Sequence, residues 1–150
     1  MKNLYLLTLL SVFTLAYCNT PAKTSEPANT MTETKNTELI GTHWKLVELN
    51  GQPVTNPVGN QKEAFIMFAK EENRISGSGG CNMLMGAYEL MDGNRLKFSG
   101  IASTMMACPD MSMERQLNNV FDSTDNYAIS GKILSLHKAK MAPLARFEAQ

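Results

Sequence analysis

The stretch SGSGGCNMLMGAY, residues 76–88, decides how the rest of the sequence is interpreted. A predicted strand, Arg74–Ser78, runs into it, and a second predicted strand, Ala87–Met91, begins at its end. Its four glycines let the backbone turn tightly or approach a neighbouring element closely. A phosphate-binding loop would need a following helix and a lysine, and neither follows here. The stretch therefore predicts close backbone packing and not a phosphate site.

Short strands separated by turn residues extend outward from this stretch in both directions. The predicted strands are His43–Leu49, Ala64–Ala69, Arg74–Ser78, Ala87–Met91, Arg95–Phe98, Tyr127–Ile129, Ile133–His137 and Leu144–Glu148. The pairs Asn50-Gly51 and Asp92-Gly93 are typical turns of β-hairpins. The six strands from Ala64 to His137 are expected to pair in sequence order as three hairpins. The pattern predicts a sheet built largely from hairpins.

One segment has a helical period instead. Its apolar and half-apolar residues fall on one stripe, which we interpret as core packing. These residues are Met113, Leu117, Val120, Phe121 and Thr124. Asp110 or Ser112 is the candidate to accept hydrogen bonds from the first amides of this helix. The sequence thus predicts an α+β domain, with a small curved antiparallel sheet or partly open β-barrel and one covering helix.

Residues 1–17 have the pattern of a signal peptide, with a positive start and an apolar run from Leu4 to Tyr17. The run is too short for a transmembrane helix, which needs roughly 20 apolar residues. Leu15-Ala16-Tyr17-Cys18 resembles a bacterial lipobox, which predicts removal of residues 1–17 and a diacylglyceryl group on the Cys18 thiol. The alternative is ordinary cleavage after Ala16, which would give a secreted soluble protein.

Residues 18–38 are predicted to be a lipidated N-terminus and flexible linker. The segment is rich in Thr, Pro, Ala and Asn and cannot build a core. A tether of this length reaches roughly 25 Å. Asn19 is not the aspartate that retains lipoproteins at the inner membrane, so in a Gram-negative organism we expect an outer-membrane anchor facing the periplasm. Residues 39–150 are long enough for one domain.

Charge composition argues against one class of partner. Lys and Arg together number 14, as do Asp and Glu, and no basic stripe is present. Nucleic-acid binding needs a cationic surface that displaces counterions from phosphates. We therefore expect no nucleic-acid partner.

A second motif, GIASTMMACP, lies at residues 100–109. The two stretches in combination are more specific than either one alone. Together the two resemble the META domain family, which includes the HslJ-like bacterial heat-shock lipoproteins, over about residues 39–150. The motif residues that carry this resemblance are Gly80, Cys81, Asn82, Gly86, Tyr88, Thr104, Cys108 and Pro109. The opening Trp44 and the helix bearing Glu114 fall in the expected order. The resemblance implies a small mixed fold in exported or lipid-anchored proteins associated with stress tolerance, without an established enzyme activity.

The motif residues have structural interpretations. Outside the cytoplasm oxidation is favoured, so Cys81 and Cys108 are predicted to form a disulfide, which would stabilise the fold by roughly 3–4 kcal/mol. Two buried free thiols are the alternative. Asn82 is expected to adopt a left-handed turn or to bond local backbone, and Tyr88 and Thr104 to pack and bond in the interior.

No catalytic residue, metal ligand or cofactor is predicted. The histidines, His43 and His137, adjoin no recognisable nucleophile motif. A Cys–His hydrolase using Cys81 or Cys108 is a minor alternative, because pairing explains both cysteines better. A zinc site lacks the close paired spacing of structural zinc modules.

Methionine is concentrated between the motif glycines and the helix, at Met83, Met85, Met91, Met105, Met106, Met111 and Met113. Thioethers suit Cu(I), but no histidine or acidic residue is interleaved, and we interpret these side chains as core packing. An intermediate possibility is a methionine-lined groove for a lipid tail or an apolar segment of a partner.

These observations favour a non-enzymatic envelope lipoprotein that acts as a binding or stress-protective module. Its expected partners are the membrane, through the lipid anchor, and an unidentified envelope protein or lipid. The alternatives are a copper-binding periplasmic protein and a secreted soluble domain.

Overall fold

The computed structural model describes residues 37–55 and 62–150. The predicted signal peptide, Cys18 and nearly all of the predicted linker lie outside these residues. In chain order the elements are β1 (His43–Leu49), β2 (Gln52–Pro53), β3 (Ala64–Phe68), η1 (Glu71–Asn73), β4 (Arg74–Gly79), β5 (Met83–Met91), β6 (Arg95–Ser103), α1 (Ser112–Ser123), β7 (Asn126–Ser130), β8 (Ile133–His137) and β9 (Ala145–Ala149). Apart from the short β2 and η1, these are the predicted elements.

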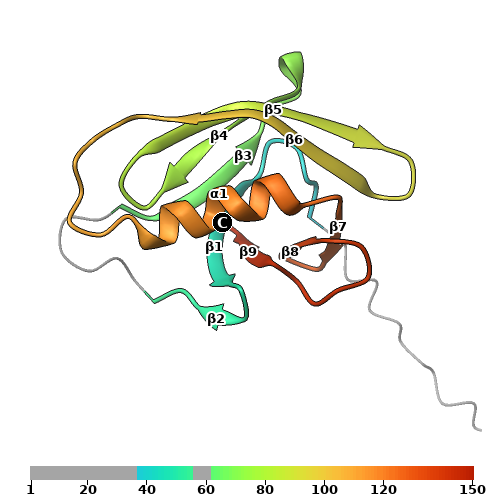
Figure 1. Ribbon diagram of the computed structural model, residues 1–150. Coiled ribbons are helices and arrows are strands. Elements are labelled where there is room, and N and C mark those ends of the chain that lie inside the picture. The colour runs from blue at the N-terminus through green and yellow to red at the C-terminus, as the bar shows by residue number, and fades with distance from the viewer. Residues whose placement is uncertain (1–36, 56–61) are drawn as a thin grey trace, which may run out of the picture. The chain divides into compact units, whose positions relative to one another are not determined.

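The nine strands form one antiparallel sheet that curves into a nearly closed ring (Figure 1). From β3 to β9 each strand pairs with the next one in the chain, and β1 pairs with both β3 and β9. The shortest strand pairing in the ring is between β6 and β7, which share one residue pair, Arg95 with Asn126. The predicted fold class, a curved antiparallel sheet with one helix, is confirmed.

The hairpins follow from residues that tolerate a positive φ. Asn50 and Gly51, at φ 50° and 76°, connect β1 to β2, as a two-residue turn with matching twist requires. Gly93 and Asn94, at φ 74° and 61°, lie in the turn between β5 and β6. The three predicted hairpins, β3 with β4, β5 with β6 and β7 with β8, are all present.

The central hairpin is longer than predicted. β5 begins at Met83 and not at Ala87, and β6 continues to Ser103 and does not end at Phe98. The pairing of the two strands shifts register between Met85 and Ala87, as at a β-bulge. A bulge breaks the alternation of side chains, so the sequence pattern hides the continuation of both strands. The added length places the ends of the hairpin at the two motif stretches.

The core lies inside the ring and under α1. Alternate residues of the strands point inward, as in β3, where positions 64, 66 and 68 are buried. Fully buried large residues include Trp44, Ile66, Phe68, Ile75, Leu96, Leu117, Phe121, Leu134, Leu136 and Phe147. The indole nitrogen of Trp44 donates a hydrogen bond to the carbonyl of Leu39 at 2.9 Å, which satisfies a buried donor.

Helix α1 packs against β4 and β6 (Figure 1) and buries the predicted stripe through Leu117, Val120 and Phe121. At its start, a carboxylate oxygen of Asp110 accepts the amide hydrogen of Ser112 at 2.8 Å, and this bond lowers the pKa of Asp110. The carboxylate therefore acts as a cap, although Met111 holds the capping position of the backbone. No helix in the described residues is long and apolar enough to cross a membrane.

Candidate functional site

A disulfide joins the two motif stretches. Cys81 follows β4 and Cys108 precedes α1, and their sulfur atoms are bonded, with the Cα atoms 6.5 Å apart. The predicted pairing is present, and the alternative of two free thiols is wrong for this structure. The bond fixes the chain between β6 and α1 against the turn between β4 and β5.

Asn82, next to this disulfide, is a fully buried centre of hydrogen bonds. Its backbone amide and side-chain Nδ2 donate to Oε2 of Glu114 at 3.3 and 3.2 Å. Its side-chain Oδ1 accepts from Oγ1 of Thr104 and from the amide of Met106, both at 2.8 Å. One amide side chain thus connects the motif turn, the helix and the loop that follows β6. Of the two alternatives predicted for Asn82, the left-handed turn is wrong because its φ is not positive, and the backbone amide that its side chain bonds is that of the distant Met106.

Glu114 is buried, with 5% of its surface exposed, and it accepts hydrogen bonds from neutral groups of Asn82. The approach is close, since a Cβ added to Gly79 would lie 2.7 Å from Cγ of Glu114. The sequence motifs did not identify this residue as part of the site. A signal was present, because Glu114 precedes Leu117 by three residues and Phe121 by seven and therefore lies on the apolar stripe.

The remaining motif residues divide between this centre and the length of β5. Gly80, at φ 104°, is buried where an added Cβ would collide with the side chain of Met113. Gly86 is buried where a Cβ would lie 2.5 Å from Cδ1 of Ile101 on β6. Tyr88 is buried as predicted and donates to the carbonyl of Ala69 at 2.8 Å, and burial raises its pKa.

Thr104 and Pro109 lie on the surface side of the site. Thr104 is exposed overall, so its predicted interior position is wrong. Its hydroxyl is nevertheless bonded, because Oγ1 donates to Asn82 and accepts the amide hydrogen of Met83 at 3.2 Å. Thr104 therefore closes the buried network at its solvent-facing edge.

The exposure of several methionines differs from the predicted core packing. Met105, Met85, Met106 and Met83 are 98%, 51%, 47% and 39% exposed, so the core-packing interpretation is wrong for these four, which we term the methionine surface. Met113 packs against the core as predicted, and Met91 and Met111 are half-buried. Alternation explains part of the difference, because Met83 and Met85 are outward positions of β5 while Leu84 between them is buried.

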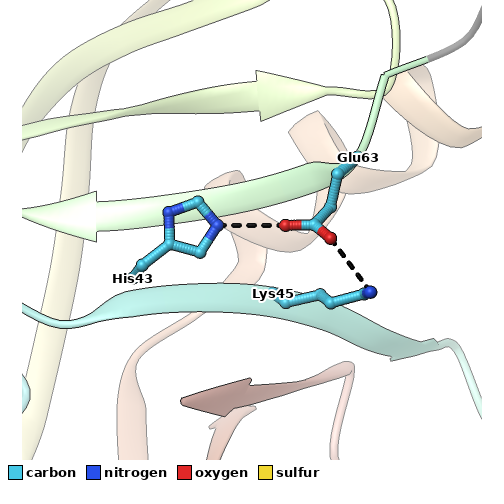
Figure 2. A network of polar contacts seen from close by, with 3 residues as sticks. All are labelled: His43, Lys45 and Glu63. Atoms are coloured by element: carbon cyan, nitrogen blue, oxygen red, sulfur yellow. Dashed lines mark hydrogen bonds and ion pairs between the residues drawn. The ribbon is translucent and has the colours of Figure 1, made fainter. Parts of the chain in front are cut away.

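His43 and His137 each contact another group through a ring nitrogen. Figure 2 shows His43 and Lys45, on β1, holding the two oxygens of the Glu63 carboxylate: His43 Nε2 lies 3.0 Å from Oε1, and Lys45 Nζ lies 2.9 Å from Oε2. The hydrogen bonds from Lys45 and from His43 lower the pKa of Glu63. The His43 ring also stacks on Phe65 at 4.2 Å.

The disulfide and the contacts of the histidines bear on two alternatives raised by the sequence, a cysteine nucleophile and a metal site. Both thiols are used by the disulfide, so a cysteine nucleophile at 81 or 108 would first require reduction. Within residues 37–55 and 62–150, no group of three or more His, Cys, Asp or Glu residues is placed to hold a metal ion. The ring nitrogens of His43 and His137 contact the Glu63 carboxylate and the Met141 carbonyl, respectively.

A shallow depression of about 300 Å³ lies at the C-terminal end of α1, beside the joint between β6 and β7. Its wall includes the cations Arg95, Lys97 and Lys138 and the carboxylates Asp122 and Asp125. Charges of both signs are therefore mixed around it, and the depression selects neither an anion nor a cation.

Comparison with known proteins agrees with this architecture. The model of the META domain family matches residues 37–150. The chain belongs to the META domain family. No curated protein matches the chain. Two structures determined by NMR resemble the META domain described here. One is 25% identical with a TM-score of 0.57 and covers 73% of this chain and 90% of its own. The other, from Burkholderia xenovorans, is 21% identical with a TM-score of 0.59 and covers 75% of this chain and 83% of its own.

The META domain brings its two motif stretches together at one end of the ring. The disulfide and the bond between Asn82 and Thr104 connect them directly, and Glu114 of α1 completes the centre. Gly86 and Tyr88 lie farther along β5 and serve strand packing. The motif therefore builds a rigid support whose outward side is the methionine surface.

Proposed function

We propose that this protein is a non-catalytic binding module of a bacterial cell envelope, held at the membrane by a lipid on Cys18, and that the methionine surface is its binding surface. The observation that carries the proposal is the exposure of Met83, Met85, Met105 and Met106 beside the most constrained part of the domain. Large apolar side chains exposed together mark binding sites more often than isolated ones.

Two features support export and tethering. The leader and the lipobox-like sequence end at Cys18, and a polar segment separates that cysteine from the domain. The disulfide between Cys81 and Cys108 is of the kind that persists in oxidising compartments. In a Gram-negative organism the outer membrane, facing the periplasm, would be the destination.

The polar side chains of the motif support a non-catalytic role. Asn82, Thr104 and Glu114 bond to one another and to backbone groups. Catalysis by nucleophile and base would require a reactive group held within reach of its activating partner. The proposal accordingly includes no cofactor and no nucleic-acid partner, and its binding partner is an envelope protein or lipid.

The anchor is tested by native and intact mass spectrometry of protein gently extracted from its own cells. A chain beginning at Cys18 with added acyl mass, found in the membrane fraction, supports the proposal. Cys18→Ser should abolish the acyl mass and release the protein from the membrane. A wild-type chain beginning at Tyr17 without acyl groups would contradict the anchor and favour the secreted alternative.

The binding surface is tested in the same extracts. The variant Met83→Gln, Met85→Gln, Met105→Gln, Met106→Gln keeps side-chain length and removes both sulfur and apolar character. We expect wild type to retain a bound mass that this variant loses, while the control Met141→Gln keeps it, because Met141 is 61% exposed but outside the methionine surface. Equal retention by all three proteins would contradict the proposed surface.

A further inference from the structure

The exposed apolar side chains of this protein are chemically unusual as a set. Among the described residues, the large hydrophobic side chains that are exposed are five methionines and Leu90. Methionine is ordinarily among the buried residue types. Aromatic residues are typical of protein-binding surfaces, and none belongs to this set. The four residues of the methionine surface therefore share a thioether sulfur, and not simply apolar area.

The backbone gathers these four residues in a small region. Met83 and Met85 are two positions apart on the outward side of β5, which separates their Cβ atoms by roughly 7 Å. Thr104 is fixed opposite Met83, because its amide donates to the Met83 carbonyl at 3.0 Å and its hydroxyl accepts the Met83 amide hydrogen. Met105 is the next residue along the chain.

The backbone of the second pair, Met105 and Met106, is also held in place. The amide of Met106 donates to the buried Oδ1 of Asn82, the residue immediately before Met83. The disulfide between Cys81 and Cys108 closes the same loop from its other side. Rigid main chain combined with flexible methionine side chains lets the sulfur atoms adjust to a common ligand while their points of attachment stay in place.

The local chemistry favours one kind of ligand. No residue from Asn82 to Ala87, or from Ser99 to Ala107, carries a charge. Neutral, soft thioethers select Cu(I), whereas Mg²⁺ and Ca²⁺ prefer carboxylate and carbonyl oxygens. The thiols that would attract zinc are occupied by the disulfide.

We infer that the thioethers of Met83, Met85, Met105 and Met106 form a Cu(I) site on the surface of the domain. This inference rests on the proposed function in taking the methionine surface as a binding surface, and it assigns Cu(I), in place of an envelope protein or lipid, as what binds there. The missing histidine and acidic residues, which argued against copper in the sequence, are not required for a monovalent soft cation. Exposure of the sulfur atoms, which the sequence did not reveal, provides the access that the ion needs.

The first experiment titrates the whole, disulfide-bonded protein with Cu(I) under anaerobic conditions, in competition with bicinchoninate. We expect one Cu(I) per chain. In parallel, protein labelled with ¹³C at the methionine methyl groups is titrated with Ag(I), a redox-inert analogue. The methyl signals of Met83, Met85, Met105 and Met106 should shift together, and that of Met141 should stay in place.

Leucine variants separate sulfur from apolar character. The variants Met83→Leu with Met85→Leu, and Met105→Leu with Met106→Leu, keep apolar bulk and should each weaken Cu(I) binding by about tenfold or more. Met141→Leu is the matched control, because it replaces an exposed methionine elsewhere and should leave the affinity unchanged. Unfolding measurements on all three variants verify that the domain is intact.

The inference is overturned if wild type and the leucine variants bind Cu(I) equally, if no Cu(I) is taken from bicinchoninate, or if Ag(I) shifts other methionines instead. The proposed binding function fails by a different result, because it requires the glutamine variant to lose the mass retained in cell extracts. A wild type that shows the retained mass but takes up no Cu(I) would remove the copper site and leave an apolar binding surface.

Discussion

Two glutamates show how differently the same side chain is used in this domain. Glu63 lies at the surface, with 40% of its side chain exposed, and contacts the cation Lys45 and the ring of His43 (Figure 2). Glu114 is buried and receives hydrogen bonds from neutral groups of Asn82. Exposed ion pairs contribute little to stability because water and salt screen them, whereas a buried carboxylate depends on every donor it has. Hydrogen bonds at the motif should therefore matter more than ion pairs at the surface.

Removing the disulfide should have the largest effect on the buried side of this comparison. The double variant Cys81→Ser, Cys108→Ser should lower the free energy of unfolding by about 3–4 kcal/mol, because the unfolded chain loses its cross-link. Urea unfolding followed by fluorescence of Trp44, the single tryptophan, measures the change. Wild type in reducing buffer provides a second route to the same state. Unchanged stability in both would show that the bond does not constrain the motif.

Asn82→Ala should lower the free energy of unfolding slightly less than loss of the disulfide, by about 3 kcal/mol. The substitution removes a side-chain donor to the buried Glu114 and the acceptor for Thr104 and Met106. The exposed Asn119→Ala, on the outer side of α1, is the control and should change stability by less than about 0.5 kcal/mol. Urea midpoints of the two variants give the comparison. Equal effects would mean that the buried network does not stabilise the fold.

Gly79→Ala should destabilise by about 2 kcal/mol, because the added methyl group would lie 2.7 Å from Cγ of Glu114. The same substitution in a Glu114→Ala background should cost clearly less, since the colliding atom is gone. A double-mutant cycle of unfolding free energies measures this coupling. If the effects of Gly79→Ala and Glu114→Ala were strictly additive, the destabilisation by Gly79→Ala would have to arise from other contacts in the turn.

Glu63→Gln should have the smallest effect and should lower the free energy of unfolding by about 0.5 kcal/mol or less at neutral pH. Added salt should reduce this difference further. Hydrogen bonds from Lys45 and His43 lower the folded-state pKa of Glu63 below its usual 4.5. The stabilisation is therefore present above that usual value and is lost as the pH falls through the lower, folded-state value. Thermal unfolding of both proteins across this range should show their stabilities converging in acid. A difference that grows in acid would contradict the assignment.

Much of the fold follows from local sequence. Alternation and turn pairs identified every long strand, and most ends agree to within one residue. The helical stripe identified α1 because Leu117, Val120 and Phe121 repeat at its period. The ends of β5 and β6 were missed because the irregular pairing near Gly86 interrupts the alternation on which such predictions depend.

The candidate site was only partly predictable. Pairing of Cys81 with Cys108 followed from two cysteines in a domain that the sequence predicts to be exported. The role of Asn82 did not, because its partners Thr104, Met106 and Glu114 are 22 to 32 residues away and meet it only through folding. Exposure of the methionines was equally hidden, because a methionine has the same composition signal whether it points inward or outward.

The pairing of β1 with β9 also has a consequence for the order of events in folding. Lys45 pairs with Glu148, about 100 residues later in the sequence. Pairings between distant residues form slowly because a long loop must first be closed. The ring therefore cannot close until β9 is available to pair with β1. Until then β1 lacks a neighbour along one edge, and loss of β9 would leave the ring open.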